Sequence, residues 1–204
     1  MLCNRLMVLV ALTALAGCGG SVSIGAGVGG GGGSVGGGVG VSSDVGGRSS
    51  HSDLTVTMHK IDAKGIGAEI GTIMLTDTDS GLRIEAALGG LPPGDHGFHL
   101  HEKGSCDPGE KDGKPAAGIA AGGHFDPGTT GKHMGPEGNG HRGDLPALHV
   151  DDSGNATGIL FAPHLRLADV RGKSFMIHAG GDNYADQPQP LGGGGARIAC
   201  GTVN

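Results

Sequence analysis

The chain contains no tryptophan and one tyrosine, and aromatic residues make up 2% of its 204 residues. A core without many large rings must be filled by small and branched aliphatic side chains, as in sheet proteins. Long blocks of one charge are also missing, and a formal charge of -6 would be repelled by the phosphates of nucleic acid. The composition therefore excludes a nucleic-acid partner and favours one compact domain of ordinary size.

The sequence also lacks an apolar run with the length and flanks of a membrane-spanning helix. The longest run, LMVLVALTALAG, follows Arg5 directly and is typical of a secretory signal peptide over residues 1–17. It ends in Leu15-Ala16-Gly17-Cys18, which resembles the lipobox of bacterial lipoproteins, where the cysteine carries the lipid. The alternative is plain secretion with a chance cysteine. Either way, we expect an exported protein, located in the periplasm or cell envelope and anchored to a membrane through Cys18 if the lipobox is used.

Residues 18–51 are rich in glycine, with scattered serine and valine and no usable periodicity. Such a composition predicts a flexible tether with a reach of roughly 30 Å. The folded domain should then occupy residues 52–204. Cys3 is removed with the signal peptide, and Cys18 is the candidate anchor. The two remaining cysteines, Cys106 and Cys200, predict one disulfide in an oxidising compartment.

Alternation of apolar and polar residues dominates this domain. Leu54, Val56 and Met58 alternate with polar residues, and residues 82–88 repeat the pattern, as expected of half-buried antiparallel strands. Further short strands fit residues 67–77, 96–102, 147–150, 158–162, 174–178 and 196–201. About eight short strands and no convincing amphipathic helix predict an all-β Greek-key barrel or sandwich. Long loops are expected over residues 103–144, 164–173 and 179–195, and loops of that length are usually functional.

Residues 122–144, GGHFDPGTTGKHMGPEGNGHRGD, have almost no apolar side chains. Something other than hydrophobic burial must order this loop. It carries His124, His133, His141 and Asp144, a donor set that suits a tetrahedral Zn²⁺ site. The alternative is a polar surface loop that happens to contain histidines.

Three further candidate ligands, all histidines, lie outside this loop. His99 and His101 are two residues apart on an expected strand, so both rings should point to the same face. His178 ends another expected strand. Together the candidate donors number seven, whereas two four-coordinate sites need eight. One imidazole shared by two metals supplies the difference, and His124 is the natural candidate because it lies between the two groups in the chain.

Six motifs within residues 54–203 resemble those of the bacterial periplasmic copper/zinc superoxide dismutases. They are GFHLHEKGSC, AAGGHFDP, GKHMGP, GHRGDLP, FMIHAGGDNY and PLGGGGARIACG, in the family's order and approximate spacing. The resemblance implies a Greek-key β-barrel that holds one copper and one zinc per subunit. It implies copper ligands at His99, His101, His124 and His178. It implies zinc ligands at His124, His133, His141 and Asp144, with His124 as the bridging imidazolate.

The resemblance assigns roles to four further residues. Asp182 matches a carboxylate that orients one copper histidine and one zinc histidine. Arg197 matches the arginine that binds and guides superoxide, and Cys106 and Cys200 match the family's disulfide. The remaining histidines lack a partner at ligand spacing, and we expect them to lie away from the metals; they are His51, His59, His96, His149 and His164.

The implied activity is dismutation of superoxide to oxygen and hydrogen peroxide, with Arg197 and His124 as catalytic residues. One alternative is a non-catalytic copper/zinc carrier. It could use the same ligands, but a positively charged Arg197 beside the copper does not suit a protein that stores cations. Another is an inactive barrel that serves as an interaction domain, although no ligand is missing here. Residues 179–195 contain no lysine, so the available guiding charges are Lys103, Lys111, Lys114 and Lys132. The family includes monomers and dimers, so a homodimer is compatible with the resemblance.

Overall fold

The computed structural model describes residues 53–204, and its main element is a curled antiparallel sheet of seven strands. The order across the sheet is β5-β10-β11-β1-β2-β3-β9. These strands are β1 (Asp53–Asp62), β2 (Gly65–Thr78), β3 (Gly81–Leu88), β5 (Phe98–His101), β9 (Ala156–Ala162), β10 (Ser174–His178) and β11 (Arg197–Thr202). The signal and tether expected over residues 1–51, including Cys18 and His51, lie outside the described residues.

Two smaller antiparallel pairs complete the strands. β4 (Gly94–His96) pairs with β8 (Leu148–Val150), and β6 (Gly109–Lys111) forms a hairpin with β7 (Lys114–Ala116). Helical turns are short: η1 (Ile119–Ala121), α1 (Leu167–Val170) and η2 (Pro190–Gly193). Within residues 53–204, no helix has the length and apolar character needed to cross a membrane.

The alternating pattern has the predicted effect on burial. Along β3, Leu82, Ile84, Ala86 and Leu88 are buried, and the residues between them are partly or fully exposed. Leucine, isoleucine and valine make up most of the core, and Phe98 and Phe175 stack within it at 5.6 Å between ring centroids. The all-β fold expected from the sequence is confirmed.

Some boundaries differ from the prediction. The single strand expected over residues 96–102 is divided at Gly97 into β4 and β5, which pair with different strands. The long loop expected over residues 103–144 contains the β6–β7 hairpin and η1, and the loop over residues 164–173 contains α1. These elements have only three or four residues each, too few for a periodic signal.

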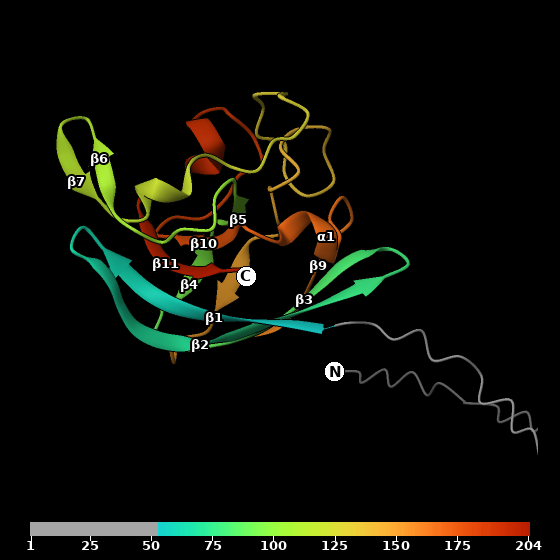
Figure 1. Ribbon diagram of the computed structural model, residues 1–204, viewed down its shortest axis with the longest axis horizontal. Helices are drawn as coiled ribbons and strands as arrows, with labels where there is room; N and C mark the ends of the chain where they lie inside the picture. The colour runs from blue at the N-terminus through green and yellow to red at the C-terminus, as the bar shows by residue number, and fades with distance from the viewer. Residues whose placement is uncertain (1–52) are drawn as a thin grey trace, which may run out of the picture. The chain divides into compact units, whose positions relative to one another are not determined.

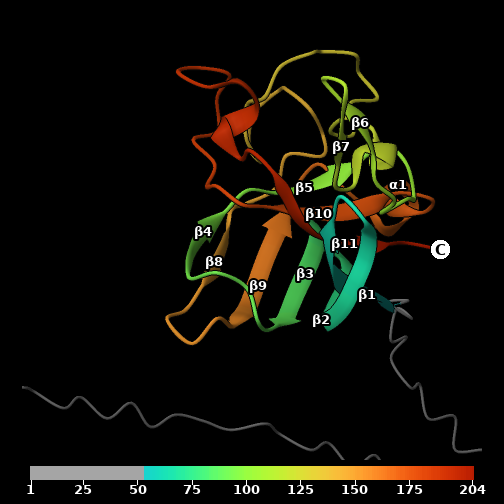
Figure 2. The ribbon, with the colours of Figure 1, turned by 90° about the vertical axis from the view of Figure 1, so that its left-hand side faces the viewer.

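The long loops gather at one end of the sheet. In Figure 2, β9, β3, β2 and β1 lie side by side, and the loops of residues 122–144 and 179–195 lie beyond β5 and β10. Figure 1 shows the β6–β7 hairpin projecting at the same end. Strand β5 is buried at all four positions because the core covers one face and these loops cover the other.

Candidate metal centre

The seven candidate donors converge on the loop-covered face of β5. His99 and His101 project from β5, and His178 ends the neighbouring strand β10, which pairs with β5. The loop residues reach them through isolated bridges from His99 to Asp144 and from His101 to His124. Six of the donors are 0–7% exposed, and the seventh, His141, is partly buried.

Two overlapping sets of side chains have donor atoms within 4.8 Å of one another. One set is His99, His101, His124 and His178; the other is His99, His124, His133 and Asp144. His99 and His124 both belong to the two sets. The second set contains His99 in place of His141, but His141 still lies close, with Nδ1 3.3 Å from Asp144 Oδ1. The structure therefore brings together all seven side chains named from the sequence.

The histidines of the loop over residues 122–144 meet at one carboxylate oxygen. Asp144 Oδ1 lies 2.9 Å from His124 Nδ1 and 3.0 Å from His133 Nδ1. Burial opposes ionisation of Asp144, but hydrogen bonds from His124 and His133 hold its pKa well below the usual range. Because Nδ1 of His124 faces this carboxylate, Nε2 is the nitrogen left for the other set of histidines.

Within residues 53–204, three buried ring nitrogens have no hydrogen-bond partner: His99 Nδ1, His101 Nε2 and His178 Nε2. Buried polar atoms are normally paired, so a cluster of unpaired nitrogen donors indicates a place for a cation. Burial also lowers the pKa of His124 to about 4 and that of His178 to about 2, which keeps both imidazoles neutral, as metal ligation requires.

The second nitrogen of each ring is held by the protein. His101 Nδ1 lies 3.0 Å from the Gly122 carbonyl, and His178 Nδ1 lies 3.3 Å from the Gly195 carbonyl. Such contacts select the tautomer and fix the direction of the free nitrogen. The ligand directions are thus set before any metal binds.

Asp182 contacts one histidine of each half of the centre. Its side chain is 0% exposed; Oδ2 lies 2.7 Å from His99 Nε2, and Oδ1 lies 2.8 Å from His133 Nε2. Burial opposes ionisation of this carboxyl, yet bonds from His133 and His99 hold its pKa well below the usual range. Gly192 packs directly above, where an added Cβ would lie 2.1 Å from Asp182 Oδ1, so only glycine fits.

Arg197 begins β11 next to the copper-side histidines. Its guanidinium donates hydrogen bonds to the carbonyl oxygens of Gly118 and Gly122, the second at 2.7 Å. The Gly122 carbonyl also contacts His101 Nδ1, so the arginine and a candidate copper ligand share one acceptor. The predicted disulfide is confirmed: Cys106 and Cys200 are bonded, and it ties the loop after β5 to the strand that carries Arg197.

The sequence did not identify His96 as part of this region. It is 2% exposed; Nδ1 lies 2.7 Å from the carbonyl of His178, and Nε2 lies 2.8 Å from the carbonyl of Pro92. Its ring therefore positions the backbone of a candidate ligand. The only available clue was its place three residues before His99, which is not a ligand spacing. The four lysines proposed as guides are exposed: Lys103, Lys111, Lys114 and Lys132.

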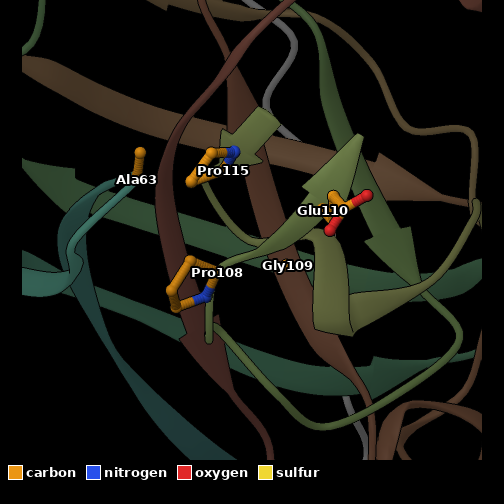
Figure 3. Close-up of a pocket in the computed structure, with 5 residues that line it drawn as sticks. All are labelled: Ala63, Pro108, Gly109, Glu110 and Pro115. Atoms are coloured by element: carbon orange, nitrogen blue, oxygen red, sulfur yellow. The ribbon is translucent and has the colours of Figure 1, made fainter. Parts of the chain in front are cut away.

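A separate hollow of about 260 Å³ lies beside the β6–β7 hairpin. It is lined by Ala63, Pro108, Gly109, Glu110 and Pro115, as Figure 3 shows. None of the candidate metal donors lines it, so the chemistry belongs to the buried histidine cluster and not to this hollow.

The model of the family described as copper/zinc superoxide dismutase (SODC) matches residues 69–203. The chain belongs to the copper/zinc superoxide dismutase family. A superoxide dismutase [Cu-Zn] from Escherichia coli K12 is 54% identical over 149 residues, which are 72% of this chain and 86% of the relative. One from Brucella abortus is 51% identical over 150 residues, covering 73% and 87% of the two chains.

Solved structures of the superoxide dismutase family give the same result. The Brucella abortus copper/zinc enzyme aligns with a TM-score of 0.74 at 50% identity, covering 75% of this chain and all of that chain. The monomeric enzyme from Salmonella enterica aligns with a TM-score of 0.68 at 52% identity, with the same coverage. The barrel and its loops are therefore those of the family.

Proposed function

We propose that the chain is a superoxide dismutase that converts two superoxide anions and two protons into oxygen and hydrogen peroxide. The observation that carries this proposal is the position of His124, which, like His99, belongs to both sets of donors, but which alone of the two directs Nδ1 to the Asp144 carboxylate. Family membership at about half identity supports the same activity.

The residues fit the two metals that the family implies. Four nitrogens suit copper, and three nitrogens with one carboxylate suit zinc. We assign copper to His99, His101, His124 and His178. We assign zinc to His124, His133, His141 and Asp144. The unpaired ring nitrogens and the Asp144 carboxylate support these assignments.

When bound, copper supplies the one-electron chemistry, and zinc supplies charge and order to the loop. The protein supplies the remaining requirements. Arg197 offers the substrate anion a fixed positive charge with forked donors. His124 can hold a proton at Nε2 while Nδ1 remains with the zinc-side donors, which places a proton where peroxide forms. Asp182 keeps the rings of His99 and His133 in fixed orientations.

A metal carrier without turnover is the alternative. Arg197 argues against it, because a guanidinium beside a cation site disfavours storage of the cation and favours an anionic substrate. An inactive barrel is also disfavoured, because the sequence lacks none of the ligands that the family implies. Metal content and superoxide consumption, measured on the same purified protein, separate the three functions: a carrier binds metals without turnover, and an inactive barrel does neither.

We expect wild type to bind one copper and one zinc per subunit and to consume superoxide. His124→Ala should lose turnover together with the bridge between the sites. His149→Ala is the matched control, because His149 is a surface histidine whose side chain is 76% exposed. Turnover by His124→Ala at the wild-type rate would contradict the proposal.

We further propose that the protein is exported and lipid-anchored at Cys18, and that it protects the cell envelope from superoxide. The support is the signal-like run over residues 1–17 and the lipobox-like residues before Cys18. Cys18→Ser should abolish partitioning into detergent while leaving the specific activity of the folded domain unchanged. A mature N-terminus other than a lipid-modified Cys18, seen by mass spectrometry, would reject the anchor. A homodimer stays a prediction, which sedimentation velocity tests directly.

A further inference from the structure

Tyr184 follows Asp182 in the loop between β10 and β11 and has an unusual backbone. Its φ is 56°, in the left-handed region that bulky side chains rarely adopt. In this conformation its N–H donates a hydrogen bond of 2.8 Å to Asp182 Oδ1, the same oxygen that contacts His133 Nε2. The backbone of Tyr184 thus helps to fix the carboxylate that connects the two halves of the centre.

The side chain of Tyr184 contacts the zinc-binding loop, residues 122–147 between η1 and β8, in two places. An added Cβ on Gly135 would lie 2.8 Å from Tyr184 Cβ and 2.9 Å from its ring, so the ring lies against the backbone there. The hydroxyl oxygen accepts a hydrogen bond of 3.0 Å from the N–H of Ala147. Gly135 comes two residues after His133, and Ala147 comes three residues after Asp144. One side chain therefore contacts the loop just beyond two of its metal donors.

Burial does not account for this arrangement. Tyr184 is 41% exposed, so the ring contributes little to the core. A strained backbone persists only where surrounding contacts hold it, and here those contacts all lead to the metal centre. Asp186, two residues further on, reinforces the same connection by accepting a hydrogen bond of 3.0 Å from the N–H of His133.

We propose that Tyr184 is a positioning residue that latches the zinc-binding loop to Asp182 and slows the release of zinc. This inference rests on the zinc site of the proposed function. The ring and the hydroxyl contact the loop on either side of His141 and Asp144, and the Tyr184 amide orients the carboxylate that fixes His133. Loss of such supporting contacts weakens metal binding although no ligand is removed.

The test uses the copper- and zinc-loaded protein and measures the rate at which zinc passes to a chelating dye. Tyr184→Phe keeps the ring but loses the bond to Ala147, and it should release zinc about fivefold faster. Tyr184→Ala loses the ring as well and should release zinc about tenfold faster or more. With cobalt in the zinc site, the visible bands of Tyr184→Ala should shift, because the positions of His133 and Asp144 change.

Phe161→Ala is the matched control, because Phe161 is a 48% exposed aromatic residue on β9, outside the metal-binding loops. It should leave both zinc release and the cobalt bands unchanged. Tyrosine emission adds an independent readout, since Tyr184 is the chain's one tyrosine and tryptophan is absent. Removal of zinc from wild type should change this emission.

Zinc release from Tyr184→Ala at the wild-type rate would overturn the latch while leaving the proposed function intact. Equal acceleration by Phe161→Ala would also overturn it, because the effect would then be one of general stability. A wild-type protein that holds no zinc would overturn the latch and the proposed function together.

Discussion

The ring of His99 and the carboxylate of Asp182 are 83 residues apart in the chain and are joined by a contact of 2.7 Å. His99 lies on β5 beneath the metal centre, and Asp182 lies in the loop between β10 and β11 that covers it. Both side chains are 0% exposed. Because the other oxygen of Asp182 contacts His133, this carboxylate couples a donor proposed for copper to one proposed for zinc.

Asp182→Asn should therefore weaken both metal sites. A carboxylate accepts hydrogen bonds at both oxygens, whereas an amide presents one acceptor and one donor, so one ring loses its partner. We expect affinity for zinc and copper to fall about tenfold or more, measured by competition with a chelator. Asp151→Asn is the control, because it removes the same charge at an exposed turn. Unchanged affinity for both metals would contradict this coupling.

Arg197→Ala should slow dismutation by roughly tenfold or more, through lost attraction and lost docking of the anion together. Arg197→Lys keeps the charge but cannot bind the carbonyls of Gly118 and Gly122 as a planar fork. Its dismutation rate should therefore lie between that of the wild type and that of Arg197→Ala. Pulse radiolysis gives these rates as a function of ionic strength.

Rising salt should slow the wild type because screening shortens the reach of the surface charges. Arg197→Ala should have a flatter salt dependence, and neutralising Lys103, Lys111, Lys114 or Lys132 should flatten it further. Equal rates for wild type and Arg197→Ala at low salt would show that the arginine neither guides nor docks the substrate.

Opening the Cys106–Cys200 disulfide should destabilise the domain. The bond closes a loop of 94 residues, and loss of such a crosslink typically costs about 2–5 kcal/mol. The double variant Cys106→Ser, Cys200→Ser should have a lower melting temperature in calorimetry. Adding reductant should not change its melting temperature further. The double variant should also lose activity, because the loop that provides the carbonyl partners of Arg197 is no longer tied to β11. A melting temperature equal to that of the wild type would contradict this account.

The metal-free protein should lose stability on mild acidification. Burial lowers the pKa of His101 well below its usual value, and that of His124 to about 4. Between about pH 6.5 and pH 4 the unfolded chain therefore binds protons that the folded chain does not, so folding weakens as the pH falls. The contribution of these lowered pKa values to the free energy of unfolding is fully present above about pH 6.5. Thermal unfolding of the metal-free protein at a series of pH values measures it, and a constant melting temperature over that range would contradict it.

Much of the fold and the centre follows from local sequence. Residues 82–88 alternate because one face of a strand meets the core and the other meets solvent, and that period is visible without coordinates. His99 and His101 share a face for the same reason. The histidines of residues 122–144 also identify a metal site, because that segment has too little apolar surface to order itself.

Other features carry no local signal. The division between β4 and β5 at Gly97 depends on which strands are available to pair with each half. His96 and Tyr184 act through bonds to backbone atoms of Pro92, His178 and Ala147, and any residue type can supply such atoms. No spacing rule could have found these partners.

The sequence by itself determined the strand pattern, the donor types and, through its motifs, the family. Only the tertiary structure decided which ring nitrogen of His99, His101 and His178 is free and which is held. That choice depends on contacts such as His99 with Asp182 and His101 with Gly122, between residues brought together by strand pairing and loop closure. Residue identity sets what an imidazole can bind, but its orientation is set by neighbours that are distant in the chain.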